Sequence, residues 1–234
     1  MLRTAAALSV LMSVLPASAG SLDYERQNTW QSLHDKAQSP IDIRRDAALE
    51  ADPEEPRTID FRNTRARLEV VDNGHAIEVE TQGPDAMIRG RHFELAQFHF
   101  HATSEHTIDG EHFPLEGHFV FRARDGRLAV VGVMYRDGDP NPLADEVLEA
   151  LDESVPDEIE DEDLAVLLPG TGSYHHYLGS LTTPPLTENV EWYVYDEPVS
   201  LSSAQIAGFT ARYSHNNRTV QPLNGRPVVH FGQN

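Results

Sequence analysis

The segment that most constrains this chain is residues 97–101, which read Gln-Phe-His-Phe-His. Side chains of a β-strand alternate between its two faces. In a strand, His99 and His101 therefore share one face. Phe98 and Phe100 share the other. Two imidazoles at this spacing can converge on one ion, with about 2.0–2.1 Å between zinc and each nitrogen. The segment thus predicts a strand with a metal site on one face and an apolar core on the other.

A second segment, residues 116–120, repeats this logic with Glu116, His118 and Val120 on one face. If the two strands pair, His118 completes a three-histidine site. Three neutral imidazoles leave the fourth tetrahedral position open, which is typical of a catalytic rather than a structural zinc site. The chain contains no cysteine, so any metal must be held by histidine and carboxylate.

Two polar residues on the ligand faces are predicted to orient the histidines. We expect Gln97 to accept the spare ring N–H of His99, and Glu116 to accept that of His118. Such contacts fix the tautomer of a metal ligand. Two alternatives stay open at this point: a half-buried strand of alternating His and Phe without metal, and a solvated carboxylate at Glu116.

The rest of the chain predicts a single β-rich domain with a few short helices and no internal repeat. Short apolar runs bounded by Gly, Pro, Asn and Asp predict strands at Leu68–Val71, Ala76–Glu80, Phe93–His101, Glu116–Arg122, Leu128–Tyr135 and Val190–Tyr195. Apolar spacing and capping residues predict helices at Pro142–Leu151 and Ser202–Tyr213. Residues 152–163 contain eight acidic side chains and are predicted to form a solvated loop.

The N-terminus has the pattern of a secretory signal. Arg3 precedes an almost entirely apolar run at residues 5–15, and Ala17-Ser18-Ala19 supplies the small residues of a cleavage site. We therefore expect a signal peptide at residues 1–19, a mature domain at 20–234, and a periplasmic or secreted protein. The alternative is a buried N-terminal helix.

The formal net charge of −20 makes nucleic acid and anionic membrane surfaces poor partners. A length of 234 residues suits one domain. No stretch after the N-terminal segment is long and apolar enough to span a membrane.

Together these residues resemble the alpha-class carbonic anhydrases, in particular their exported bacterial members. The similarity runs from about Gln38 to Phe231. Its ordered motifs are Gln38-Ser39-Pro40-Ile41-Asp42-Ile43, Asn73-Gly74-His75-Ala76, Gln97-Phe98-His99-Phe100-His101, Ser104-Glu105-His106-Thr107, Glu116-Gly117-His118, Gly179-Ser180-Leu181-Thr182-Thr183-Pro184-Pro185 and Gln221-Pro222-Leu223-Asn224-Gly225-Arg226. The resemblance implies a mostly β, α+β domain with a mainly antiparallel twisted sheet of about ten strands and a few short peripheral helices.

The resemblance also implies a function, namely reversible hydration of carbon dioxide to bicarbonate and a proton through zinc-bound hydroxide. Zn²⁺ would be the cofactor, held by the three histidines. Thr182 would orient the hydroxide and donate its own proton to Glu105. His75 would act as the proton shuttle, since histidine titrates near physiological pH. His106 would lie near the metal without binding it.

By the same resemblance, Thr183 would lie beside the substrate, and an apolar wall for carbon dioxide would be formed by Val120, Val130, Leu181 and Val190. Bacterial members are often dimers, so a homodimer is a further expectation, although the sequence locates no interface. The alternative functions are a non-catalytic binding module that kept the fold and a metal-binding protein without turnover. Ester hydrolysis would be a side activity of the same centre.

Overall fold

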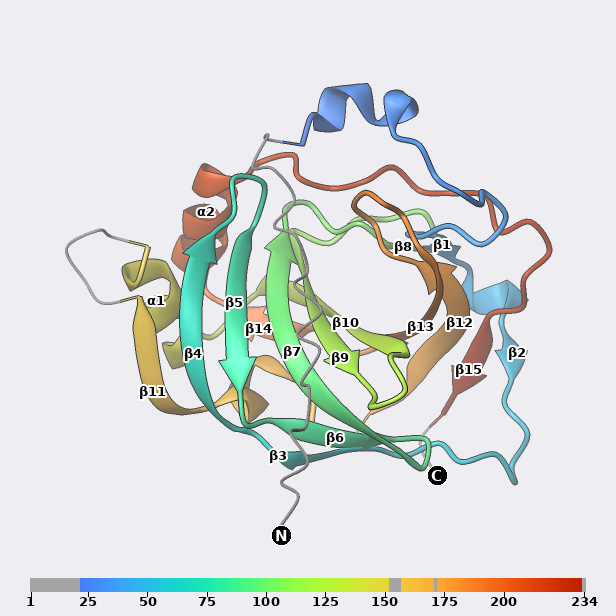
Figure 1. Ribbon diagram of the computed structural model, residues 1–234, viewed down its shortest axis with the longest axis horizontal. Helices are drawn as coiled ribbons and strands as arrows, with labels where there is room; N and C mark the ends of the chain where they lie inside the picture. Colours follow the sequence, from blue (N-terminus) through green and yellow to red (C-terminus); the bar gives the residue numbers. More distant parts are fainter. Residues whose placement is uncertain (1–21, 152–156, 171, 233–234) are drawn as a thin grey trace, which may run out of the picture.

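The computed structural model describes residues 22–151, 157–170 and 172–232, and the predicted signal segment lies outside these residues. The described chain is built around one large sheet (Figure 1). Its strands are β2 (Leu49–Glu50), β3 (Ile59–Asn63), β4 (Arg65–Asp72), β5 (Ile77–Gln82), β6 (Asp85–Ile88), β7 (Arg91–His101), β9 (Leu115–Arg122), β10 (Leu128–Asp137), β11 (Glu158–Asp163), β12 (Tyr174–Ser180), β13 (Glu188–Tyr195), β14 (Val199–Leu201) and β15 (Val229–Phe231).

The remaining elements are short. Strands β1 (Asp42–Ile43) and β8 (Thr107–Ile108) form a separate parallel pair. The α-helices are α1 (Pro142–Glu149) and α2 (Ser203–Arg212). Three 3-10 helices lie at Tyr24–Thr29, Arg45–Ala47 and Leu164–Leu167. No helix in the described part of the chain is long and apolar enough to cross a membrane.

The sheet runs in the order β11-β4-β5-β7-β9-β10-β13-β12-β15-β2, with β6 beside β7, β3 beside β6, and β14 beside β10. Most neighbours are antiparallel. Strand β10 pairs in parallel with β13 and β14, and β15 pairs in parallel with β2. The expected fold class is therefore confirmed, with the sheet mixed rather than purely antiparallel.

Each face of the sheet carries an apolar core. The larger core contains Phe98, Phe100 and Phe119, and it is closed by α1 and α2 through residues such as Val147 and Phe209. The smaller core is formed by Ile41, Ile43, Ile108, Val130, Met134, Tyr177, Val190, Trp192, Val194 and Val228. His118 lies on the same face of the sheet as the smaller core, since its ring packs against Trp192 of that core.

A β-bulge in β7 decides which side chains reach the site. The register shifts between Leu95 and Gln97, so Ala96 is an extra residue. Before the bulge, Leu95 points into the larger core, whereas Phe98 and Phe100 fill it afterwards. The extra residue thus inverts the alternation and places the odd-numbered residues from Gln97 onward on the site face.

One prediction of secondary structure is wrong. Residues 158–163 form the edge strand β11 against β4 instead of a solvated loop, and residues 152–156 lie outside the described residues. The acidic strand is compensated by arginines of β4, with Arg67 lying 2.7 Å from Glu158 and 3.2 Å from Glu160. Cross-strand pairs of opposite charge stabilise strand pairing, and a charged edge strand resists further pairing.

Candidate active site

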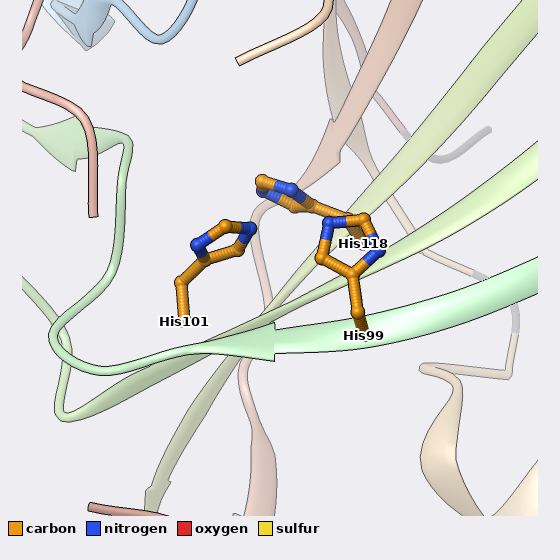
Figure 2. Close-up of side chains that lie close together, drawn as sticks. All are labelled: His99, His101 and His118. Atoms are coloured by element: carbon orange, nitrogen blue, oxygen red, sulfur yellow. The ribbon is translucent and has the colours of Figure 1, made fainter. Parts of the chain in front are cut away.

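Three histidines from two neighbouring strands point toward one another (Figure 2). His99 on β7 and His118 on β9 are direct partners in the strand register, and His101 follows two residues along β7. One ring nitrogen of each histidine lies within 4.8 Å of the corresponding nitrogens of the other two. Pairing of β7 with β9 therefore brings together the three residues that the sequence predicts as metal ligands.

Two of the three rings are held by the residues expected to orient them. Nδ1–H of His99 donates to Oε1 of Gln97 at 2.8 Å. Nε2–H of His118 donates to Oε1 of Glu116 at 2.9 Å. Each contact leaves the other ring nitrogen facing the shared centre, as a metal ligand requires.

The third ring is held by a residue that the sequence did not reveal. Nδ1–H of His101 donates to the main-chain carbonyl of Asn216 at 2.6 Å. The Asn216 side chain accepts from the amide of Ala102 at 2.9 Å and donates to the carbonyl of Phe100 at 2.9 Å. A main-chain acceptor has no residue signature, so no sequence pattern could have identified it.

The donor set suits a metal ion. Nε2 of His101 is buried and has no hydrogen-bond partner among the described residues, and such an atom in a folded core requires an explanation. Burial lowers the pKa of His99 and His101, which keeps the imidazoles neutral and able to ligate. Burial would also lower the pKa of His118, but the nearby Glu116 and Glu105 raise it.

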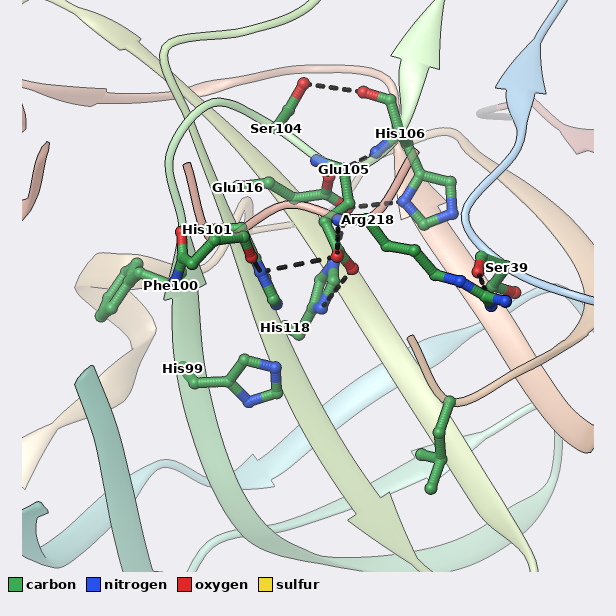
Figure 3. A network of polar contacts seen from close by, with 12 residues as sticks. Ser39, His99, Phe100, His101, Ser104, Glu105, His106, Glu116, His118 and Arg218 are labelled. Carbon is green, nitrogen blue, oxygen red and sulfur yellow. Dashed lines mark hydrogen bonds and ion pairs between the residues drawn. The ribbon is translucent and has the colours of Figure 1, made fainter. Parts of the chain in front are cut away.

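Glu116 connects the histidines to the adjoining loop (Figure 3). Its Oε1 accepts hydrogen bonds from His118 and, at 2.7 Å, from Nδ1–H of His106. Its Oε2 accepts the main-chain amides of Glu105 and His106, both at 2.8 Å. Burial alone would raise the pKa of Glu116, but His106 and His118 hold it well below its ordinary value. The carboxylate is therefore ionised beside the ligand set.

Glu105 lies on the other side of His118 and differs from expectation in one contact. Its Oε1 accepts the main-chain amide of Arg218 at 2.6 Å. Its Oε2 lies 3.9 Å from Nδ1 of His118 and is buried without a hydrogen-bond partner among the described residues. The hydrogen bond expected from Thr182 is therefore not formed in this structure: the Arg218 amide engages Oε1, and Oε2 has no hydrogen-bond partner among the described residues.

A cavity of about 230 Å³ opens over His99 and His118. Four of the predicted substrate residues line it, namely Val120, Val130, Leu181 and Thr183, and so does Thr182, which is predicted to orient the hydroxide. Val190 is not among the residues that line it; it packs in the smaller core, to which the lining residue Val130 also belongs, so its role in the wall stays a prediction. Trp192 was not predicted but also lines the cavity, and its ring centroid lies 4.8 Å from those of His118 and His106.

His75 lies near this cavity but does not line it. It follows the turn at residues 73–74 and is half-buried, with its main-chain amide donating to Oδ1 of Asn73 at 3.1 Å. Its carbonyl accepts from the Asn216 side chain at 3.1 Å. Burial lowers the pKa of His75, although hydrogen bonding to the Asn73 carbonyl opposes this. Asn216 therefore connects His75 to His101, because its side chain bonds the His75 carbonyl and its own carbonyl accepts from the His101 ring.

Comparison with known proteins identifies the family. The family model described as eukaryotic-type carbonic anhydrase matches residues 25–232. The chain belongs to this family.

Two carbonic anhydrases from bacteria illustrate the similarity. The carbonic anhydrase of Pectobacterium carotovorum is 42% identical over 201 residues, which cover 83% of this chain and 80% of the relative. The carbonic anhydrase of Klebsiella pneumoniae is 35% identical over 243 residues, covering 96% and 97% of the two chains. The match to the Klebsiella protein therefore extends over nearly the full length of both chains.

Solved carbonic anhydrases share the fold. The Thermovibrio ammonificans alpha-carbonic anhydrase, solved with sulfanilamide, has a TM-score of 0.74 and 40% identity, with 83% of this chain and 87% of that chain covered. Carbonic anhydrase Cah3 of Chlamydomonas reinhardtii, solved with acetazolamide, has a TM-score of 0.77 and 33% identity, with 92% and 98% covered. These relatives favour an enzyme that hydrates carbon dioxide over a non-catalytic binding module.

Proposed function

We propose that this carbonic anhydrase binds Zn²⁺ through His99, His101 and His118. The residues around them orient the attacking oxygen, bind carbon dioxide and carry the proton away. The observation that carries the proposal is the convergence of three ring nitrogens, each on an imidazole whose other nitrogen is hydrogen-bonded. When bound there, zinc supplies the Lewis acidity that brings the pKa of a water molecule to about 7, a value established for carbonic anhydrases.

Gln97, Glu116 and the Asn216 carbonyl keep this ligand set in place. They fix the ring orientations and tautomers, so a metal ion meets a preformed site. The ionised Glu116 also makes the His118 ring a stronger metal ligand, because the hydrogen bond from Nε2–H to the carboxylate increases the electron density on the other ring nitrogen. The expected result is tight metal binding with little rearrangement.

Thr182 and Glu105 are suited to orient the attacking oxygen. Thr182 lines the cavity beside the histidines, where its hydroxyl can accept a hydrogen bond from the nucleophile. The hydroxyl proton then needs an acceptor, and the buried Oε2 of Glu105 has no other hydrogen bond. A hydrogen bond between the two would fix the direction of the oxygen lone pair toward the substrate carbon.

The cavity wall is suited to carbon dioxide. Val120, Val130 and Leu181 provide an apolar surface for a substrate that has no net dipole. Thr183 adds a hydroxyl at the same cavity, where the more polar product bicarbonate can be hydrogen-bonded. Weak, mostly apolar contacts let a small substrate enter and a charged product leave.

His75 is the proposed proton relay. Its half-buried imidazole lies close enough to His99 for the charges of the two rings to interact. The lowered pKa keeps the ring neutral at neutral pH, so it can accept the proton that hydration releases and pass it to buffer.

Stopped-flow measurement of carbon dioxide hydration, with metal analysis of the same samples, tests this function. We expect fast turnover and one catalytic zinc in the parent protein, and loss of both in His118→Ala. His34→Ala is the matched control, since His34 is exposed and outside the site. If zinc-loaded parent protein gave no rate above buffer, the proposed function would be abandoned.

We also propose export to the periplasm or the medium, supported by the signal-like pattern of residues 1–19. Cell fractionation and N-terminal sequencing of the mature protein test this, with a mature start near Gly20 expected. The homodimer stays a prediction that analytical ultracentrifugation can test.

A further inference from the structure

A second cluster of metal-ligating side chains lies outside the catalytic centre, near the edge of the sheet formed by β15 and β2. His175 on β12 and His230 on β15 are direct partners in the strand register. Their ring centroids are 4.9 Å apart, and the rings are tilted by 32°. Asp196 follows the last residue of β13, the strand on the other side of β12. Strand pairing alone therefore brings these three residues together.

One carboxylate lies between the two imidazoles. Oδ1 of Asp196 is 2.7 Å from Nδ1 of His175, and Oδ2 is 3.1 Å from Nε2 of His230. The candidate ligand atoms all lie within 4.8 Å of one another, the same spacing that the catalytic histidines satisfy. Two imidazoles and one carboxylate form a donor set that binds zinc in known enzymes and suits cobalt and nickel as well.

His175 is the buried member of this cluster. The residue is only 2% exposed. Its Nδ1 is buried and lies 2.7 Å from Oδ1 of Asp196, but among the described residues this ion-pair contact does not meet hydrogen-bond geometry. A metal ion bound by both groups would satisfy this buried nitrogen more fully than the poorly aligned carboxylate does. Asp196 and His230 are partly exposed, so an ion can reach the cluster from solvent.

Glu50 gives His230 the outer contact that metal-bound histidines usually have. It is the register partner of His230 on the neighbouring strand β2. Nδ1–H of His230 donates to Oε1 of Glu50 at 3.1 Å, and Nε2 is hydrogen-bonded to Oδ2 of Asp196 at 3.1 Å. Because Glu50 holds the Nδ1 proton, release of the Nε2 proton would leave that nitrogen as the ligand atom for an ion.

We propose that His175, Asp196 and His230 form a second site for a divalent transition-metal ion such as Zn²⁺, separate from the catalytic centre. Three protein ligands leave one position for water. An ion there would link β12, the end of β13 and β15. The proposal does not depend on the catalytic function, because none of these residues belongs to the catalytic site.

Metal stoichiometry tests the proposal with the whole protein. The parent protein, dialysed against buffered zinc, is expected to bind two equivalents by elemental analysis. Asp196→Asn and His230→Gln are each expected to bind one while carbon dioxide hydration continues at the parental rate. His118→Ala should also keep one equivalent. His176→Gln is the control and should keep two, because adjacent strand residues face opposite sides of the sheet.

Cobalt provides a second measurement. Co²⁺ added to His118→Ala is expected to give visible absorption bands that disappear when Asp196→Asn is added to that variant. Retained hydration activity shows that the single variants at the cluster are folded. One equivalent in the parent protein, or a second equivalent that survives both Asp196→Asn and His230→Gln, would overturn the proposal.

Discussion

Glu116 and His118 are joined by a hydrogen bond of 2.9 Å from Nε2–H of the imidazole to Oε1 of the carboxylate. Both residues are buried. The other carboxylate oxygen accepts the main-chain amides of Glu105 and His106. One charged side chain therefore fixes a ligand ring and also the loop that carries the second acidic residue of the site.

Replacing Glu116 by glutamine is expected to weaken zinc binding by about 10- to 100-fold, as for other partners of metal ligands. The amide would retain one acceptor but would turn an NH₂ group toward donors that now meet a carboxylate. Zinc transfer to a competing chelator measures the effect. Glu69→Gln on the exposed face of β4 is the control. Equal zinc affinity in Glu116→Gln and the parent would contradict this role.

Replacing His75 by alanine is expected to reduce kcat for hydration by roughly 10- to 100-fold in weak buffer, at the lower end of general acid–base effects. The ratio kcat/KM should be nearly unchanged, because the relay acts after carbon dioxide has reacted. Added imidazole buffer should restore kcat. A parallel fall in kcat and kcat/KM without rescue would indicate a structural role instead.

The pH dependence of kcat should report the same residue. Burial lowers the pKa of His75 below the ordinary histidine value of about 6.5. Raising the pH converts the ring to the neutral acceptor, so this conversion is already more than half complete at pH 6.5. We expect kcat to rise with a midpoint below pH 6.5 and this step to vanish in His75→Ala. A His75-dependent midpoint above pH 6.5 would contradict the prediction.

The strands that carry the site were predictable because their pattern is local. Alternation in residues 97–101 and 116–120 assigns each histidine to a face, and register pairing then brings His99 opposite His118. The bulge at Ala96 was not predictable, since nothing at that position distinguishes an extra residue from a paired one. The bulge nevertheless determines whether the odd- or the even-numbered side chains of β7 face the cavity.

The missing parts of the site act through the main chain or across long sequence separations. The Asn216 carbonyl and the Arg218 amide contact His101 and Glu105 without using a side chain. Tyr24 likewise lies far away in sequence. Its buried hydroxyl has no hydrogen-bond partner among the described residues, and burial and Glu105 raise its pKa. Only the folded chain shows that these segments meet.

Gly179 is expected to tolerate no larger residue. A Cβ atom there would lie 2.1 Å from Oγ of Ser39 and 2.9 Å from the ring of Trp192. Gly179→Ala should therefore destabilise the protein by about 1–3 kcal/mol, as overpacking does, measured as a lower urea midpoint. Gly170→Ala is the control, because a Cβ at that position meets nothing within 4 Å. Equal midpoints for the two variants would contradict this packing argument.

Filling the cavity should slow the encounter with substrate and leave the metal in place. Val120 and Val130 are partners in the register of β9 and β10, and both line the cavity. Val120 is only half-buried, so a phenylalanine there can extend into the cavity without entering the larger core. We expect Val120→Phe to lower kcat/KM by about tenfold or more, which corresponds to about 1.4 kcal/mol in the barrier. Zinc content should equal that of the parent.

Val120→Ala is the matched control, since it enlarges the cavity and should change kcat/KM much less. Stopped-flow kinetics and metal analysis on the same samples separate substrate access from metal loss. If Val120→Phe kept the parental kcat/KM, carbon dioxide would have to approach by another route. A fall in kcat/KM that followed zinc content would instead assign the effect to the ligand His118, two residues before Val120 on β9.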